Sequence, residues 1–339
     1  MRAMRIVGPG KPLELHDLPI PKPSGVEVVI KVEACGVCHT DLHFVTSQIP
    51  GARYPFTPGH EISGIIHDVG QNVKDFKIGE RVIVYPHFGC EVCKQCLRGF
   101  PNHCENPPLL GFIMDGGYAE YVLIPHFKYL IKVGDSDLDE AAVLTCSALT
   151  AYSALKEAGL ENDDLLVIIG VGGLGTMAVQ LAKKLTGVTV VAMDIDERKL
   201  SLALRMGADY VLNPSKEDPI KFIKTISENG AGADAVIDFV NNSETAEIAF
   251  KMLRTRGRHV FTGMYGGTLT IPLTQMAISG IKLVSGKIGR PGDLRELVSL
   301  YKRGLIKPFI SKKFRLEDAN KALEELKAGE ILGRAVLKP

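Results

Sequence analysis

Four closely spaced cysteines constrain the fold of this chain more than any other feature. Cys90, Cys93, Cys96 and Cys104 follow the spacing C-x2-C-x2-C-x7-C, so one short lobe can wrap a single tetrahedral ion. Four thiolates around zinc form a closed, structural site. Four cysteines can also hold an iron–sulfur cluster. A zinc ribbon that binds nucleic acid is a third interpretation, which the lack of a basic stripe around the lobe disfavours.

A second set of candidate ligands is scattered along the chain and mixed in chemistry. It comprises Cys38, the pair His60 and Glu61, and Cys146. Three protein ligands plus water make a catalytic zinc site, so this set could leave one position open for a substrate. Glu61 is either a ligand itself or a carboxylate beside the metal. The remaining cysteine, Cys35, is expected to pack as a small hydrophobic side chain.

The composition excludes several classes of function. The 339 residues suit about two domains. With 40 basic and 39 acidic residues the formal net charge is +1, so no large basic field attracts nucleic acid or an anionic membrane. The opening MRAMRIVGPG lacks the apolar core of a secretory signal, and no run of about 18 apolar residues predicts a membrane span. Cysteines clustered at ligand spacings are typical of metal binding in a reducing cytoplasm, where we expect the protein.

The pattern of apolar residues changes along the chain. Residues 1–150 hold short β-branched runs punctuated by Gly and Pro, which predicts a β-rich domain. Residues 151–286 alternate apolar runs with helix-like segments, which predicts βαβ units and a doubly wound parallel sheet. Residues 287–339 hold two amphipathic segments and a strand-like end, Arg334–Leu337.

A glycine-rich turn at 170–175 predicts a dinucleotide site. The motif G-x-G-x-x-G is weak alone, but here an apolar strand-like run precedes it and a helix-like run follows. The glycines allow a tight turn, and the helix start offers N–H groups to a pyrophosphate. The residues of the turn that we expect to contact the cofactor are Gly170, Gly172, Gly173, Leu174 and Gly175.

An acidic residue then indicates which dinucleotide binds. Asp194 ends the next strand-like run, where a carboxylate hydrogen-bonds the adenosine ribose and repels a 2′-phosphate. NAD(H) is therefore favoured over NADP(H), although Arg198 or Lys199 could still receive a phosphate. The alternative is an ordinary tight turn with Asp194 opening a helix.

Three segments resemble the signatures of one enzyme family. They are CHTDLH at 38–43, the pattern GHE-x2-G-x5-G-x2-V at 59–73, and GGYAEY at 116–121. Together with the four-cysteine lobe, the glycine turn and Asp194, they resemble the zinc-dependent alcohol dehydrogenases of the medium-chain dehydrogenase/reductase superfamily. The resemblance covers essentially the whole chain. The length resembles the shorter bacterial and archaeal members, which are usually tetramers, more than the longer dimeric animal enzymes.

This resemblance implies roles for the residues of the open site. Cys38, His60 and Cys146 match the ligands of the catalytic zinc, and Glu61 matches a carboxylate that can enter the metal's shell. Asp41 matches an acid that orients His60.

The resemblance also implies contacts with the proton and the cofactor. Thr40 and His43 match a relay that carries the alcohol proton to solvent. Thr150 matches a residue near the nicotinamide, and Arg334 one near the pyrophosphate. His39 departs from the family, since many members place an arginine there on the pyrophosphate.

We therefore expect an α/β enzyme with two zinc ions per subunit and bound NAD. Residues 1–150 and 287–339 are expected to form a GroES-like catalytic domain, and residues 151–286 a Rossmann domain. The reaction is reversible hydride transfer between an alcohol and NAD, giving an aldehyde or ketone, in a homotetramer or possible homodimer. The alternatives are a polyol or other secondary-alcohol dehydrogenase, or a zinc-bearing structural or nucleic-acid-binding protein without activity.

Overall fold

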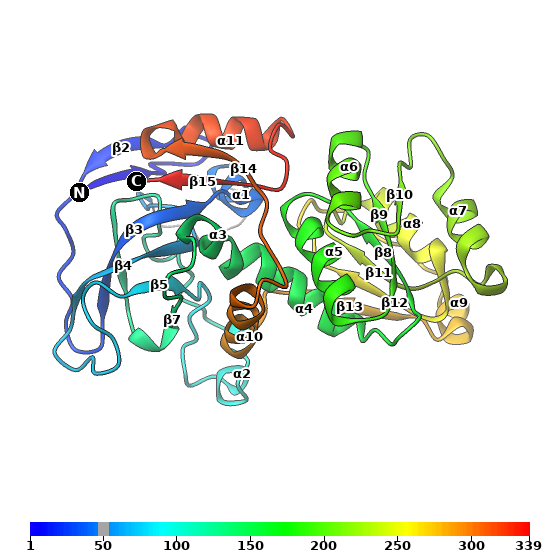
Figure 1. Ribbon diagram of the computed structural model, residues 1–339, viewed down its shortest axis with the longest axis horizontal. Coiled ribbons are helices and arrows are strands. Elements are labelled where there is room, and N and C mark those ends of the chain that lie inside the picture. The colour runs from blue at the N-terminus through cyan, green and yellow to red at the C-terminus, as the bar shows by residue number, and fades with distance from the viewer. Residues whose placement is uncertain (47–53) are drawn as a thin grey trace. The chain divides into compact units, whose positions relative to one another are not determined.

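The computed structural model describes residues 1–46 and 54–339, which divide into two compact units (Figure 1). Parts of the C-terminal region belong to the first unit, so the chain passes between the units more than once. The first unit comprises Met1–Cys146, Arg290–Lys302 and Pro308–Pro339, and the second comprises Ser147–Gly289 and Arg303–Lys307.

Buried β-branched runs form a seven-stranded sheet in the first unit. Its strand order is β14-β15-β3-β4-β5-β7, and β6 also pairs with β3. The central strand β3 (Val28–Gly36) pairs antiparallel with β4 (Glu61–Val69), β6 (Tyr121–Ile124) and β15 (Arg334–Lys338). The other strands of this unit are β5 (Arg81–Val84), β7 (Leu130–Lys132), β14 (Ile310–Arg315) and the separate pair β1 (Arg2–Arg5) and β2 (Glu14–Asp17).

The register of this sheet brings distant parts of the chain together at one point. Gly36, at the end of β3, pairs with Glu61 on one side and with Val336 on the other. The C-terminal strand therefore lies close to the start of β4. Because side chains along a strand follow its pairing register, Arg334 and Glu61 meet here although no local sequence pattern links them.

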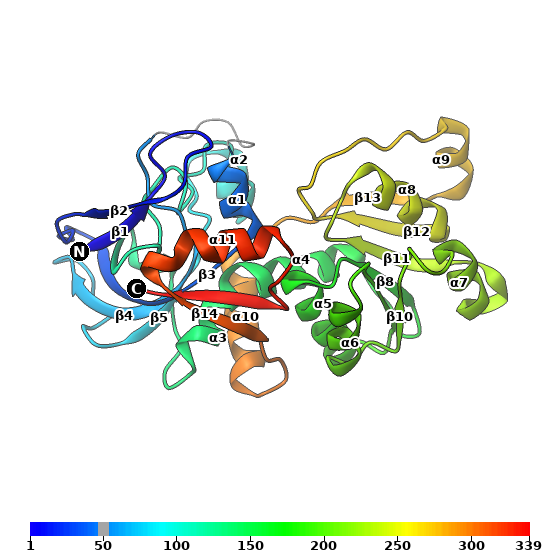
Figure 2. The ribbon, with the colours of Figure 1, turned by 90° about the horizontal axis from the view of Figure 1, so that it is seen from above.

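Helix α3 of the first unit packs against this sheet, whereas α1 and α2 carry candidate site residues. The apolar side of α3 packs on β3 and β15, through Ala142, Val143, Ala34 and Val336. Helix α11 contacts α1 (Figure 2). The helices are α1 (His39–Val45), α2 (Lys94–Leu97), α3 (Leu138–Val143), α10 (Pro291–Lys302) and α11 (Ala319–Lys327).

The second unit is built on a six-stranded parallel sheet. The strand order is β10-β9-β8-β11-β12-β13. In this doubly wound arrangement successive strands are added outward on one side of β8 and then, from β11, on its other side. Helices cover both faces of the sheet (Figure 2). The strands are β8 (Leu165–Ile169), β9 (Thr189–Met193), β10 (Tyr210–Leu212), β11 (Ala233–Asp238), β12 (Leu253–Phe261) and β13 (Lys282–Ser285).

The core of the second unit is built around strands that are buried on both faces. All five residues of β8 are buried, as a strand covered on both faces requires. One face packs against Ile223 of α7 and against Ala249 and Met252 of α8. The helices are α4 (Leu149–Ala158), α5 (Gly173–Leu185), α6 (Glu197–Arg205), α7 (Pro219–Ile226), α8 (Ser243–Met252) and α9 (Leu273–Ser279).

The predicted fold class is confirmed, with a doubly wound sheet in one unit and a β-rich sheet in the other. The amphipathic segment near the C-terminus is divided, because a 3-10 turn over Leu316–Asp318 precedes α11. Among the described residues, none of the helices combines the length and apolar character that crossing a membrane requires.

Candidate active site and metal centres

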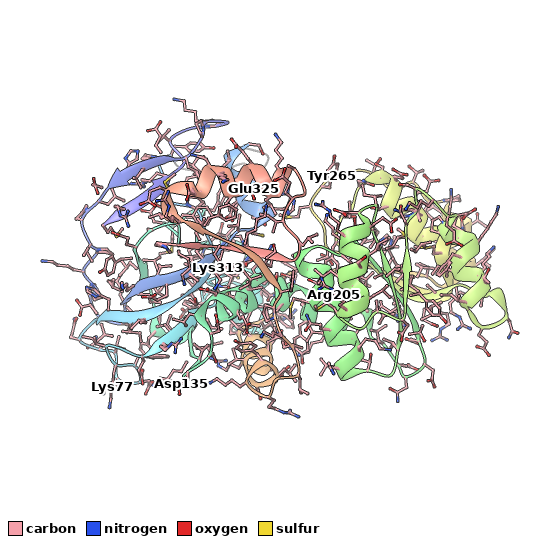
Figure 3. The ribbon with its side chains drawn as sticks, turned by 45° about the horizontal axis from the view of Figure 1, so that its top comes forward. Lys77, Asp135, Arg205, Tyr265, Lys313 and Glu325 are labelled. Atoms are coloured by element: carbon pink, nitrogen blue, oxygen red, sulfur yellow. The ribbon has the colours of Figure 1, made fainter. Side chains whose placement is uncertain are left out.

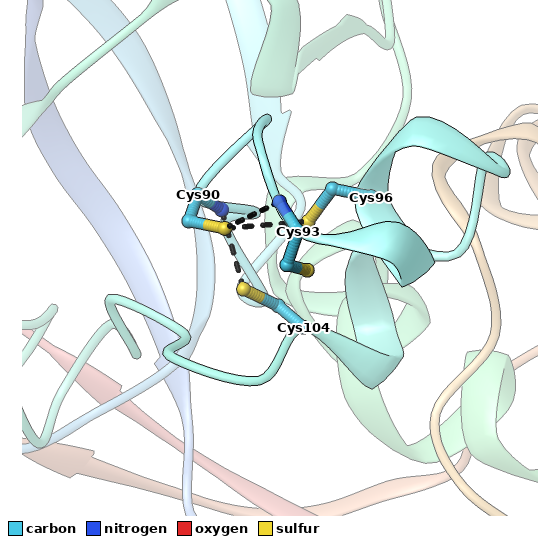
Figure 4. A group of neighbouring side chains, drawn as sticks. All are labelled: Cys90, Cys93, Cys96 and Cys104. Atoms are coloured by element: carbon cyan, nitrogen blue, oxygen red, sulfur yellow. Dashed lines mark hydrogen bonds between the residues drawn. The ribbon is translucent and has the colours of Figure 1, made fainter.

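The four-cysteine lobe brings its thiols together. The sulfur atoms of Cys90, Cys93, Cys96 and Cys104 all lie within 4.8 Å of one another, and Figure 4 shows the four side chains gathered around one point. Helix α2 of this lobe has only four residues and buries none of them. The lobe therefore has little core of its own, which suits a segment organised by a metal ion.

Backbone N–H groups of the lobe favour thiolates. The N–H of Cys93 donates to Sγ of Cys90 at 3.4 Å, and the N–H of Cys90 donates to Sγ of Cys104 at 3.3 Å. Backbone N–H groups of Glu105 and Cys96 lower the pKa of the Cys93 thiol to about 6. Burial instead raises the pKa of Cys96 to about 12. A bound dication would offset that burial, so this donor set fits a closed zinc site.

The second set of candidate ligands also converges, although its members come from three places in the chain. Ligand atoms of Cys38, His60, Glu61 and Cys146 all lie within 4.8 Å of one another. Cys38 precedes α1, and His60 and Glu61 stand at the start of β4. Cys146 lies in a π-helical turn, Leu144–Ala148, that follows α3. Such turns are rare and frequently occur at functional sites.

Two glycines allow this convergence. Gly59, directly before His60, has a φ of +97°, and a Cβ there would lie 2.4 Å from Cδ1 of Tyr118. A Cβ on Gly36 would lie 2.0 Å from Oε2 of Glu61. Any larger residue at either position would displace the backbone or side chain of a candidate ligand.

A buried carboxylate orients the imidazole of this set. Oδ1 of Asp41 lies 3.3 Å from Nδ1 of His60, and both side chains are buried. Burial opposes the charge on His60, but the neighbouring Asp41 outweighs it and raises the pKa of His60 to about 10. Because Nδ1 faces the carboxylate, Nε2 is the nitrogen left for a metal.

The surroundings of Cys38 also favour its thiolate form. A hydrogen bond with Cys146 is the largest influence that lowers the pKa of Cys38 well below its usual value. Burial opposes this effect, whereas Arg334 and His60 add to it. Two thiols, one of them strongly acidic, together with an oriented imidazole fit the donor set of a catalytic zinc.

Glu61 lies in a buried ion pair with Arg334. Its side chain is fully buried, and within the described part of the chain neither carboxylate oxygen has a hydrogen-bond partner. A carboxylate in this state needs nearby positive charge, which Arg334 supplies and a metal at the same site would add. The sequence pattern did not predict this pair.

The two residues of the expected relay lie on α1. Oγ1 of Thr40 is 3.6 Å from Sγ of Cys38, so the hydroxyl stands beside the mixed ligand set. His43 follows three residues later on the same helix, a spacing that puts both side chains on one face.

The glycine turn of the second unit lies between β8 and α5. Gly170 has a φ of +83°, and a Cβ on Gly175 would lie 2.2 Å from the carbonyl oxygen of Gly170. Around Gly172, by contrast, a Cβ would meet nothing within 4 Å. Gly170 and Gly175 are therefore tightly packed against each other. The backbone at Gly172 is free of close neighbours, just before the first residues of α5, Gly173 and Leu174.

Asp194 lies beside this turn. Its Oδ2 accepts a hydrogen bond from the N–H of Val171 at 2.9 Å, and its Oδ1 accepts one from Asp196 at 3.0 Å. A carboxylate has about four acceptor sites, so Asp194 retains capacity for further donors. Thr150 and Lys199 belong to the same unit, on α4 and α6.

Tyr265 is a further exposed group at this edge of the sheet. It follows β12, is 76% exposed and projects from the ribbon in Figure 3. Because the strands of this sheet are parallel, their carboxyl ends share one edge, where dinucleotides bind in folds of this class. No motif marks Tyr265 in the sequence, so it was not among the predicted residues.

Comparisons with known proteins agree with this geometry. The alcohol dehydrogenase GroES-like domain model matches residues 24–135, and the zinc-binding dehydrogenase model matches residues 173–303. An NAD-dependent alcohol dehydrogenase of Sulfurisphaera tokodaii is 42% identical, with 100% of both chains covered.

Solved structures of alcohol and sugar dehydrogenases have the same fold as this chain. The alcohol dehydrogenase of the archaeon Aeropyrum pernix has a TM-score of 0.94 and 36% identity, with 100% of both chains covered. The D-arabinose dehydrogenase of Sulfolobus solfataricus has a TM-score of 0.88 and 30% identity, with 100% of this chain and 99% of that chain covered. The chain belongs to the zinc-dependent alcohol dehydrogenases of the medium-chain dehydrogenase/reductase superfamily.

Proposed function

We propose that this chain transfers a hydride reversibly between an alcohol and NAD, giving an aldehyde or a ketone. The observation that supports this most directly is the convergence of Cys38, His60 and Cys146 within 4.8 Å. Two thiols and one imidazole leave a tetrahedral ion one position for a substrate oxygen. Zinc held by these residues would act as a Lewis acid and lower the pKa of the alcohol.

Thr40 and His43 move the proton in this proposal. The Thr40 hydroxyl lies beside Cys38 and can accept the alcohol's proton while it donates its own, because a hydroxyl is both donor and acceptor. His43, one turn along α1, takes that proton and exchanges it with solvent near neutral pH. Thr40 thus serves as the relay and His43 as the general base.

Glu61, paired with Arg334, lies beside the other candidate ligands of the proposed zinc site. The ion pair with Arg334 supports a role for Glu61 as a carboxylate beside the metal. Its ligand atom also lies within 4.8 Å of the other three candidates, so Glu61 is placed to become a ligand when the substrate position is empty.

We propose a second zinc ion at Cys90, Cys93, Cys96 and Cys104, which gives two ions per chain. Four thiols within 4.8 Å support a closed site with no room for a substrate. Its task would be to stabilise the lobe around α2 rather than to take part in the reaction.

We propose that NAD binds at the glycine turn of the second unit. The open backbone at Gly172 supports contact with the pyrophosphate, and the acceptor capacity of Asp194 supports contact with the adenosine ribose. Arg198 is paired with Asp196 at 2.7 Å, which leaves Lys199 as the nearby cation for a 2′-phosphate and favours NAD over NADP. The proposed contacts are Gly170, Gly172, Gly173, Leu174, Gly175 and Asp194, with Lys199 near the adenosine and Thr150 near the nicotinamide. Arg334 belongs to the other unit, where it pairs with Glu61, and its contact with the pyrophosphate stays a prediction from the family resemblance.

The domain boundaries and assembly are also proposals. We place the catalytic domain at residues 1–150 and 287–339 and the NAD domain at 151–286, close to the limits of the two compact units. We propose a homotetramer. Among the described residues, the edge strand β13 pairs with β12 alone, and α9 buries none of its residues. Seven cysteines without a disulfide among the described residues support a reducing cytoplasm as the compartment.

A panel of substrates tests the activity. Zinc-loaded protein is assayed with primary, secondary and aromatic alcohols, their carbonyl products, polyols and D-arabinose, each with NAD and with NADP. We expect the highest kcat/KM with a simple alcohol and NAD. The similarity to a D-arabinose dehydrogenase makes a sugar or polyol the second candidate, and a higher kcat/KM for those substrates would favour it. No turnover by protein that holds two zinc ions would contradict both.

A further inference from the structure

A buried tyrosine is connected to the proposed catalytic zinc site through Asp41. Tyr118 is fully buried, and its hydroxyl donates a hydrogen bond to Oδ2 of Asp41 at 3.0 Å. The same Oδ2 accepts a hydrogen bond from the N–H of Cys38 at 3.0 Å. The other oxygen of Asp41, Oδ1, lies 3.3 Å from Nδ1 of His60. One carboxylate therefore links Tyr118 to two of the candidate zinc ligands.

The backbone around Tyr118 also supports the segment that leads to His60. The N–H groups of Gly116, Gly117 and Tyr118 donate to the carbonyl oxygens of Thr57, Gly59 and Pro58, at 2.7, 2.8 and 3.0 Å respectively. The ring of Tyr118 lies against Gly59, where a Cβ would come within 2.4 Å of it. The tyrosine thus touches both the backbone before His60 and the carboxylate that faces its imidazole.

The hydroxyl itself requires an explanation, because phenylalanine would fill the same space. A hydroxyl in a fully buried position costs free energy unless it forms a hydrogen bond. Burial raises the pKa of Tyr118 well above its usual value, so the group stays protonated and acts as a donor. Its acceptor is a carboxylate with no exposed surface, and hydrogen bonds to a charged partner are the stronger kind.

We propose that Tyr118 is a positioning residue for the zinc site. Its hydroxyl and the N–H of Cys38 hold Oδ2 of Asp41 from one side, which fixes the carboxylate with Oδ1 towards His60. The imidazole then keeps Nε2 directed at the metal. Without the hydroxyl, the carboxylate can rotate and His60 is held less firmly. This inference rests on the proposed zinc site.

The test compares Tyr118→Phe with Tyr85→Phe in the full-length zinc protein. Tyr85 is also a fully buried tyrosine of the first unit, and it stacks on Tyr129 rather than on this network. Zinc release to a chromogenic chelator is followed in time, and the phase that Cys38→Ser lacks is assigned to the mixed site. Loss of a partner behind a metal ligand typically costs 10–100-fold in affinity or activity. We therefore expect Tyr118→Phe to speed that phase about 10-fold or more, with release from the four cysteines unchanged.

Two further measurements separate positioning from packing. In protein loaded with Co²⁺, the visible absorption of the mixed site should change in Tyr118→Phe and not in Tyr85→Phe. In the background of Asp41→Asn, adding Tyr118→Phe should change zinc release little further, because both substitutions break the same connection.

Other outcomes would overturn the inference. They are an unchanged release phase and cobalt spectrum in Tyr118→Phe, an equal change in Tyr85→Phe, or full additivity with Asp41→Asn. A wild-type protein whose zinc is held by the four cysteines alone would instead refute the proposed catalytic site itself.

Discussion

Single side chains on α1 carry the proposed proton transfer. Thr40 stands 3.6 Å from the sulfur of Cys38, and His43 follows one turn later. A threonine hydroxyl is too weak an acid to store a proton, so it can only pass one on. The rate of alcohol oxidation should therefore depend on whether a base beyond Thr40 accepts that proton.

The substitution His43→Ala should slow alcohol oxidation most at low pH, where solvent base is scarce. Removing a general base typically costs about 100-fold or more when proton transfer limits the rate. The measurement is kcat/KM for one alcohol between about pH 6 and pH 10, with and without a small imidazole buffer, which should recover part of the loss.

The matched control is His67→Ala, since His67 is exposed on β4 and contacts the ring of Tyr121. Parallel pH profiles for wild type and His43→Ala, without rescue by imidazole, would show that His43 is not the base. A deuterated alcohol measured alongside reports whether hydride transfer limits the rate.

Asp194→Ala should weaken NAD binding and improve NADP binding. Each change should be about 1–3 kcal/mol, because hydrogen bonds to the charged carboxylate are lost and its repulsion of a 2′-phosphate disappears. Asp194 also accepts N–H groups from Val171 and Asp196, so a melting curve must show that the turn stays folded. A wild-type enzyme with the higher kcat/KM for NADP would contradict this reading of Asp194.

Sequence reasoning at the residue scale named two groups of side chains that the structure brings together, but it did not predict all their partners. The set predicted from cysteine spacing and the scattered, mixed set each converge within 4.8 Å. The ion pair of Glu61 and Arg334 was not predictable, because it depends on how β15 and β4 flank the end of β3. The contact between Tyr118 and Asp41 likewise depends on a hydrogen bond between distant segments.

At the scale of elements, we expect the lobe around α2 to depend on its proposed metal. The helix has four residues and buries none of them, so the usual hydrophobic stabilisation is missing. Elements of this kind are stable when a bound ion supplies the folding free energy.

Cys93→Ser should therefore lower the melting temperature by roughly 5 °C or more, since it opens the closed site. Cys38→Ser should abolish turnover and leave the melting temperature nearly unchanged. Calorimetry, activity and zinc content are measured on both variants, and each should retain about one zinc ion per chain against about two in wild type. Wild-type activity in Cys38→Ser would refute the division of roles.

Elements of the second unit were easier to predict than those of the first. The apolar run at 165–169 coincides with β8, because a strand buried on both faces needs an unbroken apolar sequence. Strand β12 begins earlier than its apolar residues suggest. Three arginines interrupt the apolar pattern, at positions 254, 256 and 258. Arg256 adopts a φ of +63°, in the part of β12 where the pairing with β11 is irregular. The π-helical turn at Cys146 has no periodic signal in the sequence.

At the scale of the whole molecule, two exposed elements of the second unit are candidates for contacts between subunits. Strand β13 is an edge of the parallel sheet in the second unit, and within residues 1–46 and 54–339 its one partner strand is β12. An open edge strand is a template for pairing with another chain. Nearby, α9 exposes Leu273 at 85% and Ile278 at 79%, and exposed apolar groups that cluster on one element favour an interface.

We expect light scattering of wild-type protein to give roughly four times the chain mass of 36.8 kDa. Replacing both exposed side chains, as Leu273→Glu with Ile278→Glu, places charge on α9 and should reduce that mass, because an interface core excludes unpaired carboxylates. The control is Ile78→Glu, the same chemical change at an isoleucine that is 64% exposed in the first unit. It should leave the mass unchanged. A monomeric wild type would refute the assembly itself, and a double variant with unchanged mass would show that subunits meet elsewhere.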